Sequence, residues 1–176
     1  MIGFPNSFAM SIVIDLDKIS TVVTEIRVNG ELHSEAEPAL VYQNGVKLWY
    51  LHGKFHRDNG PAIEYPDGSK GFAIDGELHR LDGPAFIYSD GSLEWRVHGQ
   101  LHRTDGPAIV TKYESQWWVD GKRHREDGPA IELNDGDPKK KGNSQYYLQN
   151  IEIISPSTHD FLKLVAVWKV EQVLES

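Results

Sequence analysis

Short apolar runs alternate with turn residues along most of this 176-residue chain, and the pattern repeats. In one unit, Leu93 to Val97 has the pattern of a strand, His98-Gly99 that of a turn, and Gln100 to His102 that of the returning strand. Short β-type runs separated by two-residue turns that contain glycine are typical of β-hairpins. Asp-Gly or Asn-Gly pairs follow the next run in several units, and these pairs are the strongest short-range signal for a hairpin. The pattern therefore predicts antiparallel hairpins over residues 21–150.

The units have a nearly fixed length, because the phrase His-Arg-x-Asp-Gly-Pro-Ala returns at regular intervals. It occurs four times, with Asn59 in the Asp position of the first copy, and a degraded copy runs from His33 to Ala39. The steps from one His to the next are 23, 23, 23 and 22 residues. A period of this length marks a repeat array in which neighbouring units stack on one another. The four full copies begin at His56, His79, His102 and His124.

Equivalent positions of successive units hold similar side chains. Residues two apart in a strand share a face of the sheet. Two such columns, expected on one face, contain Ile26, Trp49, Phe72, Trp95 and Trp117, and Val28, Leu51, Ile74, Val97 and Val119. The column between them, expected on the opposite face, contains Arg27, Tyr50, Ala73, Arg96 and Trp118. We therefore expect a mainly β fold, an elongated antiparallel hairpin array of five units plus a partial sixth, in one continuing sheet.

Both ends of the chain differ from the units, as the capping units of repeat proteins do. Residues 1–20 contain a partly alternating run, Ser11 to Asp17, that favours a capping strand. Gln145 to Asn150 resembles the first half of a sixth unit. Ser155-Pro156 then precedes apolar residues in a helical pattern, which predicts a capping helix within 151–176. The expected parts are residues 1–20, 21–150 and 151–176.

The composition narrows the range of partners. A net charge of −8 and a pI near 5.4 argue against a nucleic-acid binder that works through phosphate contacts. The absence of cysteine excludes disulfides, cysteine-based zinc sites and thiol catalysis. The sequence lacks a signal-peptide pattern, and its apolar stretches are shorter than the roughly 20 residues that span a membrane. These observations predict a cytoplasmic protein with no membrane partner.

The order Trp-x-x-x-Gly-x-x-His, followed by Gly, a β run and Asp-Gly, resembles the MORN repeat in its phage and bacterial variant. Residues 72–79 and 95–102 carry this resemblance most clearly, and it extends over about residues 21–150. One departure is that His-Arg-x-Asp-Gly-Pro-Ala replaces the usual short His-Gly-x-Gly stretch. The resemblance implies a hairpin array that serves as a scaffold or binding surface, without shared catalytic residues. It also implies a phage or bacterial inhibitor or antitoxin-type role, in the host cytoplasm if the protein is phage-encoded.

The recurring His, Arg and Asp residues are interpreted first as parts that shape each unit. Equivalent residues of adjacent hairpins lie about 10 Å apart, whereas each zinc ligand lies about 2.1 Å from its ion. We therefore expect no metal site. At a sharp turn Asp can accept backbone N–H bonds and Gly supplies unusual backbone dihedrals, and Arg can form charge-assisted bonds with that Asp or with the next unit's. The structural positions are His56, His79, His102, His124, Asp82, Asp105, Asp127, Trp49, Trp95 and Trp117.

In a second interpretation, the arginines and some of the aromatic residues bind a partner. The repeated arginines could form a cationic stripe, and Trp118 and Tyr147 lie on the face where a structural need is less evident. A single sheet leaves an apolar face to be covered, exposed apolar patches mark interaction sites, and Trp, Tyr and Arg are enriched at interface hot spots. The candidate partner-binding residues are Tyr50, Arg96, Trp118, Tyr147, Arg57, Arg80, Arg103 and Arg125.

The sequence contains none of the common hydrolase, nucleotide-binding or metalloprotease motifs. It therefore predicts a non-enzymatic protein–protein interaction module that needs no cofactor. Two alternatives stay open. One is a sponge that binds a nucleotide or another small anion through the arginine stripe. The other is a structural homo-oligomer, such as a homodimer, that buries the apolar face against its own copy.

Overall fold

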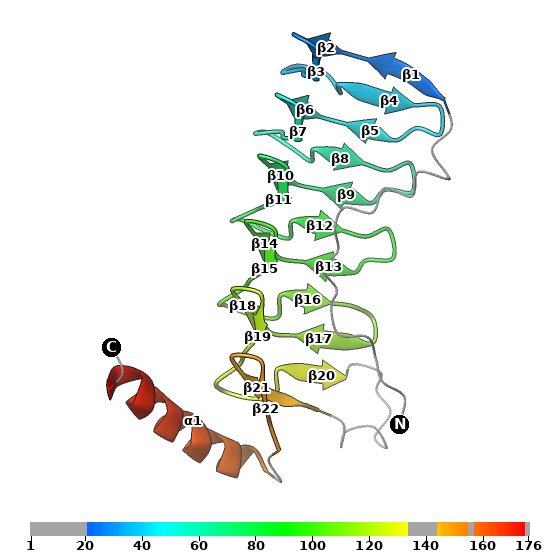
Figure 1. Ribbon diagram of the computed structural model, residues 1–176. Helices are drawn as coiled ribbons and strands as arrows, with labels where there is room; N and C mark the ends of the chain where they lie inside the picture. Colours follow the sequence, from blue (N-terminus) through cyan, green and yellow to red (C-terminus); the bar gives the residue numbers. More distant parts are fainter. Residues whose placement is uncertain (1–20, 134–143, 155–156, 175–176) are drawn as a thin grey trace.

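The computed structural model describes residues 21–133, 144–154 and 157–174. These residues form an elongated, mainly antiparallel β array that ends in a single helix, α1 (Thr158–Leu174), as the hydrophobic pattern predicts (Figure 1). The expected leader strand within residues 1–20 and the helix-entry pair Ser155-Pro156 lie outside the described residues. The helix is neither long nor apolar enough to cross a membrane, and the described residues contain no other helix.

A long antiparallel sheet of ten strands runs the length of the array. Along this order, neighbouring strands are joined alternately by a longer segment that leaves the sheet and by a short turn (Figure 1). In spatial order the strands are β1 (Val22–Glu25), β4 (Leu40–Tyr42), β5 (Lys47–Leu48), β8 (Ile63–Glu64), β9 (Lys70–Gly71), β12 (Phe86–Ile87), β13 (Leu93–Glu94), β16 (Ile109–Val110), β17 (Glu114–Gln116) and β20 (Ile131–Leu133).

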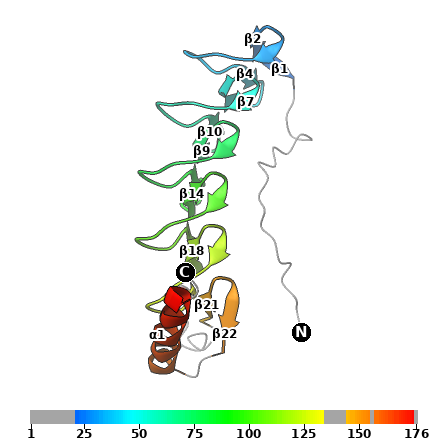
Figure 2. The ribbon, with the colours of Figure 1, turned by 60° about the vertical axis from the view of Figure 1, so that its left-hand side comes forward.

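Six separate two-stranded hairpins stack beside this sheet, and we call them the hairpin column (Figures 1 and 2). They are β2 (Arg27–Val28) with β3 (Glu31–Leu32), β6 (Tyr50–Leu51) with β7 (Lys54–Phe55), β10 (Ala73–Ile74) with β11 (Glu77–Leu78), β14 (Arg96–Val97) with β15 (Gln100–Leu101), β18 (Trp118–Val119) with β19 (Lys122–Arg123), and β21 (Tyr146–Leu148) with β22 (Ile151–Ile153). The last hairpin corresponds to the partial sixth unit.

The chain passes from the long sheet into the hairpin column at the repeated aromatic residue. The sequence favours one strand from Leu93 to Val97, but the structure divides it at Trp95 into β13 and β14. The Trp95 N–H donates to the Ala108 carbonyl at 2.8 Å, and its carbonyl accepts the His102 N–H at 3.1 Å. Hydrogen bonds to two different segments hold the two sides of this residue, so the units form two columns instead of one continuing sheet.

Two kinds of turn close the hairpins. In the hairpin column both central residues have positive φ, as at His98 (48°) and Gly99 (72°), which is the mark of the type I′ turn favoured in two-residue hairpins. In the long sheet the turns after β4, β8 and β12 have positive φ at the glycine alone, as at Gly68 (93°), whose N–H bonds the Tyr65 carbonyl. The turn between β16 and β17 contains no glycine. Asn-Gly and Asp-Gly pairs therefore do mark the turns, as the sequence indicates.

The apolar core fills the angle between the sheet and the hairpin column. Leu48 and Ile63 of the sheet are fully buried against Tyr50 and Phe55 of a hairpin. At the other end, Phe161 and Val165 of α1 cover Leu148 of the last hairpin. The side of a hairpin that carries Tyr50 and Phe55 is called the inner face below. It is the face on which departures from the repeat gather.

Candidate functional site

Each full corner segment (residues 56–62, 79–85, 102–108 and 124–130) places its arginine over the aromatic residue of the same unit. The Arg103 Cζ lies 4.0 Å from the centroid of the Trp95 ring. The other pairs, at 3.8–4.0 Å, are Arg57 with Trp49, Arg80 with Phe72 and Arg125 with Trp117. A guanidinium at this distance from a ring face gains cation–π attraction.

The same arginines also bond their own corner. The Arg103 Nε donates to Asp105 at 2.8 Å and its Nη1 donates to the Pro107 carbonyl at 3.2 Å. Arg80 and Arg125 likewise bond Asp82 and Asp127. These bonds lower the pKa of the three carboxyl groups below their usual value, because the Arg hydrogen bond stabilises the charged form. The expected Arg–Asp bonds are therefore present within each of these units.

In the first full corner, where Asn59 replaces Asp, Arg57 takes a different partner. Its Nη1 lies 3.3 Å from a carboxylate oxygen of Glu64. Arg125 makes the same kind of contact with Glu132, at 2.7 Å, in addition to its bond with Asp127. The four arginines of the predicted stripe are thus stacked, ion-paired and held in the corners, which leaves little of their bonding capacity for an anion.

The corner glycine is required mainly because it leaves room for the arginine side chain, and less because of the backbone conformation of the turn. A Cβ added at Gly106 would lie 3.0 Å from the Arg103 Cζ, and one at Gly83 would lie 3.1 Å from the Arg80 Cζ. Gly60 has a φ of +152°, but Gly83, Gly106 and Gly128 do not have the positive φ that restricts a position to glycine. The expectation of unusual glycine dihedrals is therefore wrong for three corners. The close guanidinium explains the glycine there.

The corner histidines join successive units. The Nδ1 of His79 accepts the backbone N–H of His98, the first turn residue of the next hairpin, at 3.2 Å. His33, His56, His102 and His124 accept the equivalent N–H groups at 3.3, 3.3, 3.3 and 3.4 Å. The His102 Nδ1 also contacts an Asp120 carboxylate oxygen at 2.7 Å. Each histidine thus links two hairpins, and the described residues contain no group of three or more potential ligands that could hold a metal ion.

The residues directly before and after each corner aromatic form a flanking pair on the inner face. Glu94 and Arg96 are ion-paired at 2.8 Å, and Trp118 Nε1 donates to Gln116 at 2.9 Å. Each pair is chemically matched, either as ions, by hydrogen bonding or as apolar or small residues. The pairs are Glu25 with Arg27, Leu48 with Tyr50, Gly71 with Ala73, Glu94 with Arg96, Gln116 with Trp118, and Gln145 with Tyr147. The residue type therefore changes from unit to unit in the column that runs from Arg27 to Trp118, because each side chain matches the residue two positions before it.

Two residues predicted to bind a partner lie deep in these pairs. Arg96 is 5% exposed and also donates to the Gly99 carbonyl at 2.7 Å. Tyr88 donates to the other oxygen of Glu94, and burial together with that carboxylate raises the pKa of Tyr88. Tyr50 is half-buried against Phe55, and burial raises its pKa to about 12. Arg96 and Tyr50 therefore support the interior of the array, and little of the Arg96 side chain is left for a partner.

Trp118 and Tyr147, by contrast, converge on a residue that the sequence analysis did not single out. The Cζ of Arg123 lies 4.9 Å from the Trp118 ring centroid and 5.3 Å from the Tyr147 centroid. Its position is apolar in the four preceding hairpins, as Leu32, Phe55, Leu78 and Leu101, and is Glu152 in the last hairpin. That departure from the column was a visible signal in the sequence. We call Trp118, Arg123 and Tyr147 the Arg123 cluster.

Arg123 differs from every other arginine of the chain in its bonding. All seven arginines lie in the described residues, and six have a carboxylate within 4.0 Å. Among the described residues, no carboxylate or hydrogen-bond acceptor contacts the Arg123 side chain, and its Nε is buried without a partner. A buried polar group without a partner costs about 1–3 kcal/mol. The fold thus holds an uncompensated guanidinium between two aromatic rings.

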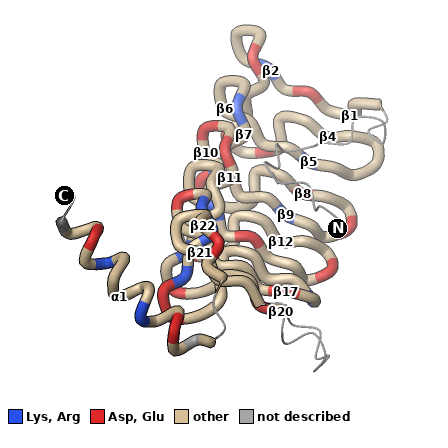
Figure 3. Tube along the Cα trace, turned by 60° about the horizontal axis from the view of Figure 1, so that its bottom comes forward, with Lys and Arg blue, Asp and Glu red and all other residues tan. Residues whose placement is uncertain are grey.

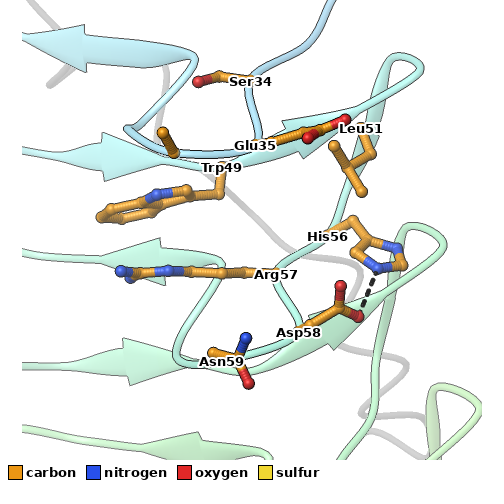
Figure 4. Close-up of a pocket in the computed structure, with 9 residues that line it drawn as sticks. Ser34, Glu35, Trp49, Leu51, His56, Arg57, Asp58 and Asn59 are labelled. Atoms are coloured by element: carbon orange, nitrogen blue, oxygen red, sulfur yellow. Dashed lines mark hydrogen bonds and ion pairs between the residues drawn. The ribbon is translucent and has the colours of Figure 1, made fainter.

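A pocket lies at the opposite end of the array, between the degraded corner and the first full corner (Figure 4). Ser34 stands there in place of the corner arginine, and Trp49 and Arg57 point the same way in successive layers. His56 and Arg57 in its wall already have Asp58 and Glu64 as partners. The Trp49 Nε1 has no acceptor, but it is closed off from solvent. The remaining polar lining, such as Asn59, is partly or fully exposed, so the pocket offers no enclosed and accessible polar group that would select a ligand.

Charge is mixed along the array. Basic and acidic positions are interspersed on the side of the hairpin column (Figure 3). A surface of mixed sign does not supply the continuous basic stripe that phosphate-backbone binding needs.

The fold and its contacts define a mainly β hairpin repeat protein with a helical end. Comparison of the sequence with protein-family models finds no family that matches. Comparison with curated proteins likewise finds no match.

Proposed function

We propose that this chain is a non-enzymatic protein–protein interaction module whose anchor is the Arg123 cluster. The observation that carries the proposal is the convergence of Trp118 and Tyr147 on an arginine that has no carboxylate of its own. Trp, Tyr and Arg are the residue types that dominate interface hot spots. The repeat units provide a rigid support, because each hairpin is bonded to the next through its histidine and turn.

Two features support a protein partner over the sponge alternative. The corner arginines that would bind a small anion are occupied by aspartate, glutamate, proline carbonyls and aromatic rings. The Arg123 cluster also offers two aromatic rings beside its guanidinium, and Trp, Tyr and Arg are the residue types enriched at protein interfaces. A more specific role as a phage or bacterial inhibitor rests on the resemblance to the MORN repeat alone.

The test is quantitative capture from a lysate of the encoding organism with the full-length protein. We expect one or more proteins to be captured by the wild type and lost with Trp118→Ala and Arg123→Leu. Lys122→Gln is the matched control, since it removes an exposed charge next to the cluster without touching it. Thermal unfolding of each variant confirms that it is folded. Equal capture by all four proteins, or no specific capture, overturns the proposal.

A second candidate, self-association, has its own supporting observation. Helix α1 covers the last hairpin with Phe161 and Val165, yet Leu162, Leu164, Val167, Val170 and Val173 remain 46–74% exposed. Apolar side chains gathered on one exposed element are typical of an interaction surface. Light scattering tests it: a second copy on α1 predicts a dimer mass, which Leu162→Lys combined with Val170→Lys reduces to that of the monomer.

A further inference from the structure

We propose that Arg123 binds a carboxylate of an acidic segment in the partner protein, with Trp118 and Tyr147 as its aromatic walls. This inference rests on the proposed function and deepens it by naming the chemistry of the partner. It starts from a comparison within the molecule. Every other arginine, including the buried Arg96, is neutralised by a carboxylate of this chain.

The backbone presents Arg123 in a fixed position. Its N–H donates to the Asn150 side chain at 2.7 Å, and its carbonyl accepts the Asn150 N–H at 2.9 Å. The residue also pairs across β18 and β19 with Trp118. Both strands and the next hairpin thus hold the main chain, so the guanidinium meets a partner with little loss of conformational freedom.

The side chain has donors left for a ligand. Its Nε is closed off from solvent, but the two terminal nitrogens are not buried and have no acceptor in the part of the chain that the structure describes. The Arg123 Cζ lies over both the Trp118 ring and the Tyr147 ring. A carboxylate matches this arrangement because two parallel N–H donors of a planar guanidinium bond its two oxygens.

The surroundings favour a single negative charge over a phosphate. Glu152 lies opposite Tyr147 in the last hairpin, and Glu114 bonds the Gln116 side chain that holds Trp118. Neither carboxylate comes within 4.0 Å of Arg123, and both add negative charge to the strands that carry its aromatic walls. A phosphate carries about −1.5 to −2 charge at neutral pH, and the chain already carries −8. A carboxylate with apolar neighbours satisfies the arginine and uses the aromatic walls.

The experiment selects partners from a phage-displayed library of random twelve-residue peptides on the full-length protein. Peptides that bind the wild type are expected to share an Asp or Glu next to apolar residues. The best peptide is then synthesised with Glu, with Gln and with phosphoserine at that position. Each is titrated against wild type, Arg123→Leu, Trp118→Ala and the control Lys122→Gln. Arg123→Leu introduces the residue found at Leu32, Leu78 and Leu101 of three preceding hairpins and removes an unpaired buried nitrogen, so it should fold at least as well.

We expect the Glu peptide to lose affinity by about tenfold to a hundredfold on the change to Gln, and by the same factor with Arg123→Leu. The two changes together should cost no more than either alone, since they remove one interaction. Peptides that need Trp118 but tolerate both Gln and Arg123→Leu overturn the carboxylate inference and leave the interaction module intact. Tighter binding of the phosphoserine peptide assigns the site to phosphate and overturns it as well. Absence of any peptide that depends on Trp118 or Arg123 overturns the inference together with the proposed function.

Discussion

In each full corner segment, a close contact with the arginine explains why the repeat requires glycine. At Gly106 a methyl group would lie 3.0 Å from the Arg103 Cζ, although the backbone there tolerates any residue. We predict that Gly106→Ala lowers the free energy of unfolding by about 1–3 kcal/mol, the usual cost of overpacking. Denaturant unfolding measures this loss. The control is the same change in an Arg103→Ala background, where the methyl group has room. An equal loss in both backgrounds contradicts the explanation.

The corner aspartates provide a residue-scale prediction about pH. Their pKa values are lowered in the folded protein, first by the hydrogen bond from Arg80, Arg103 or Arg125, below the usual 3.8. A lowered folded pKa means that the stabilisation is complete above the unfolded pKa and is lost as pH falls through the folded pKa. We predict that replacing Asp82, Asp105 and Asp127 together by Asn makes stability less dependent on pH below about 4.

Denaturant midpoints between pH 7 and pH 3 check this prediction for wild type and the triple variant. Asp82 and Asp105 are almost fully exposed, so the difference should be small and should shrink as salt is added. A triple variant that follows the wild type across the acid range would show that the corner ion pairs do not contribute.

At the scale of the strand and hairpin, the sequence predicts the turns and the length of the repeat. It does not predict that each strand is divided where the chain leaves the long sheet for the hairpin column. Type I′ turns need positive φ at two consecutive residues, which only a few residue types tolerate, so pairs such as Asp75-Gly76 are visible in the sequence. The run from Leu93 to Val97 contains no breaking residue. Its division at Trp95 depends on hydrogen bonds to Ala108 and His102, which come from segments later in the chain. A local pattern cannot contain that information.

The flanking pair of one unit should be replaceable by the flanking pair of another unit, provided that both residues are changed together. Glu94→Leu alone leaves the 5% exposed Arg96 without its carboxylate, and breaking a buried ion pair costs about 3–5 kcal/mol. Glu94→Leu with Arg96→Tyr copies the Leu48 and Tyr50 pair of another unit. We predict that the double variant returns to within about 1.5 kcal/mol of wild type, as volume-matched apolar replacements do. Chemical unfolding of the two single variants and the double variant measures the coupling. Additive losses would show that the pairs are not interchangeable.

For the whole molecule, the functional candidates follow from the departures from the repeat more than from the repeat itself. The sequence indicates Trp118 and Tyr147 because they lie on the face where a structural need is less evident, and the structure brings both to Arg123. Arg123 was not predicted from the sequence. What distinguishes this arginine is the absence of a nearby carboxylate among the described residues, and only the three-dimensional structure shows that absence. The corner arginines suggested a stripe because the sequence shows their spacing but not their bonds to Asp, Pro and Trp.

The array is quasi-one-dimensional, so damage at one end should stay near that end. Phe161 of α1 is fully buried against the last hairpin, and Phe→Ala in such a site costs about 3–5 kcal/mol. We predict that Phe161→Ala speeds amide hydrogen exchange strongly in β21 and β22, less in β18 and β19, and not at all in β8 to β12. Leu162→Ala is the control, because this neighbour is 46% exposed and its loss should change little. A uniform rise in exchange along the chain would mean that the units unfold as one cooperative block, and the helix would then stabilise the entire array instead of its last unit.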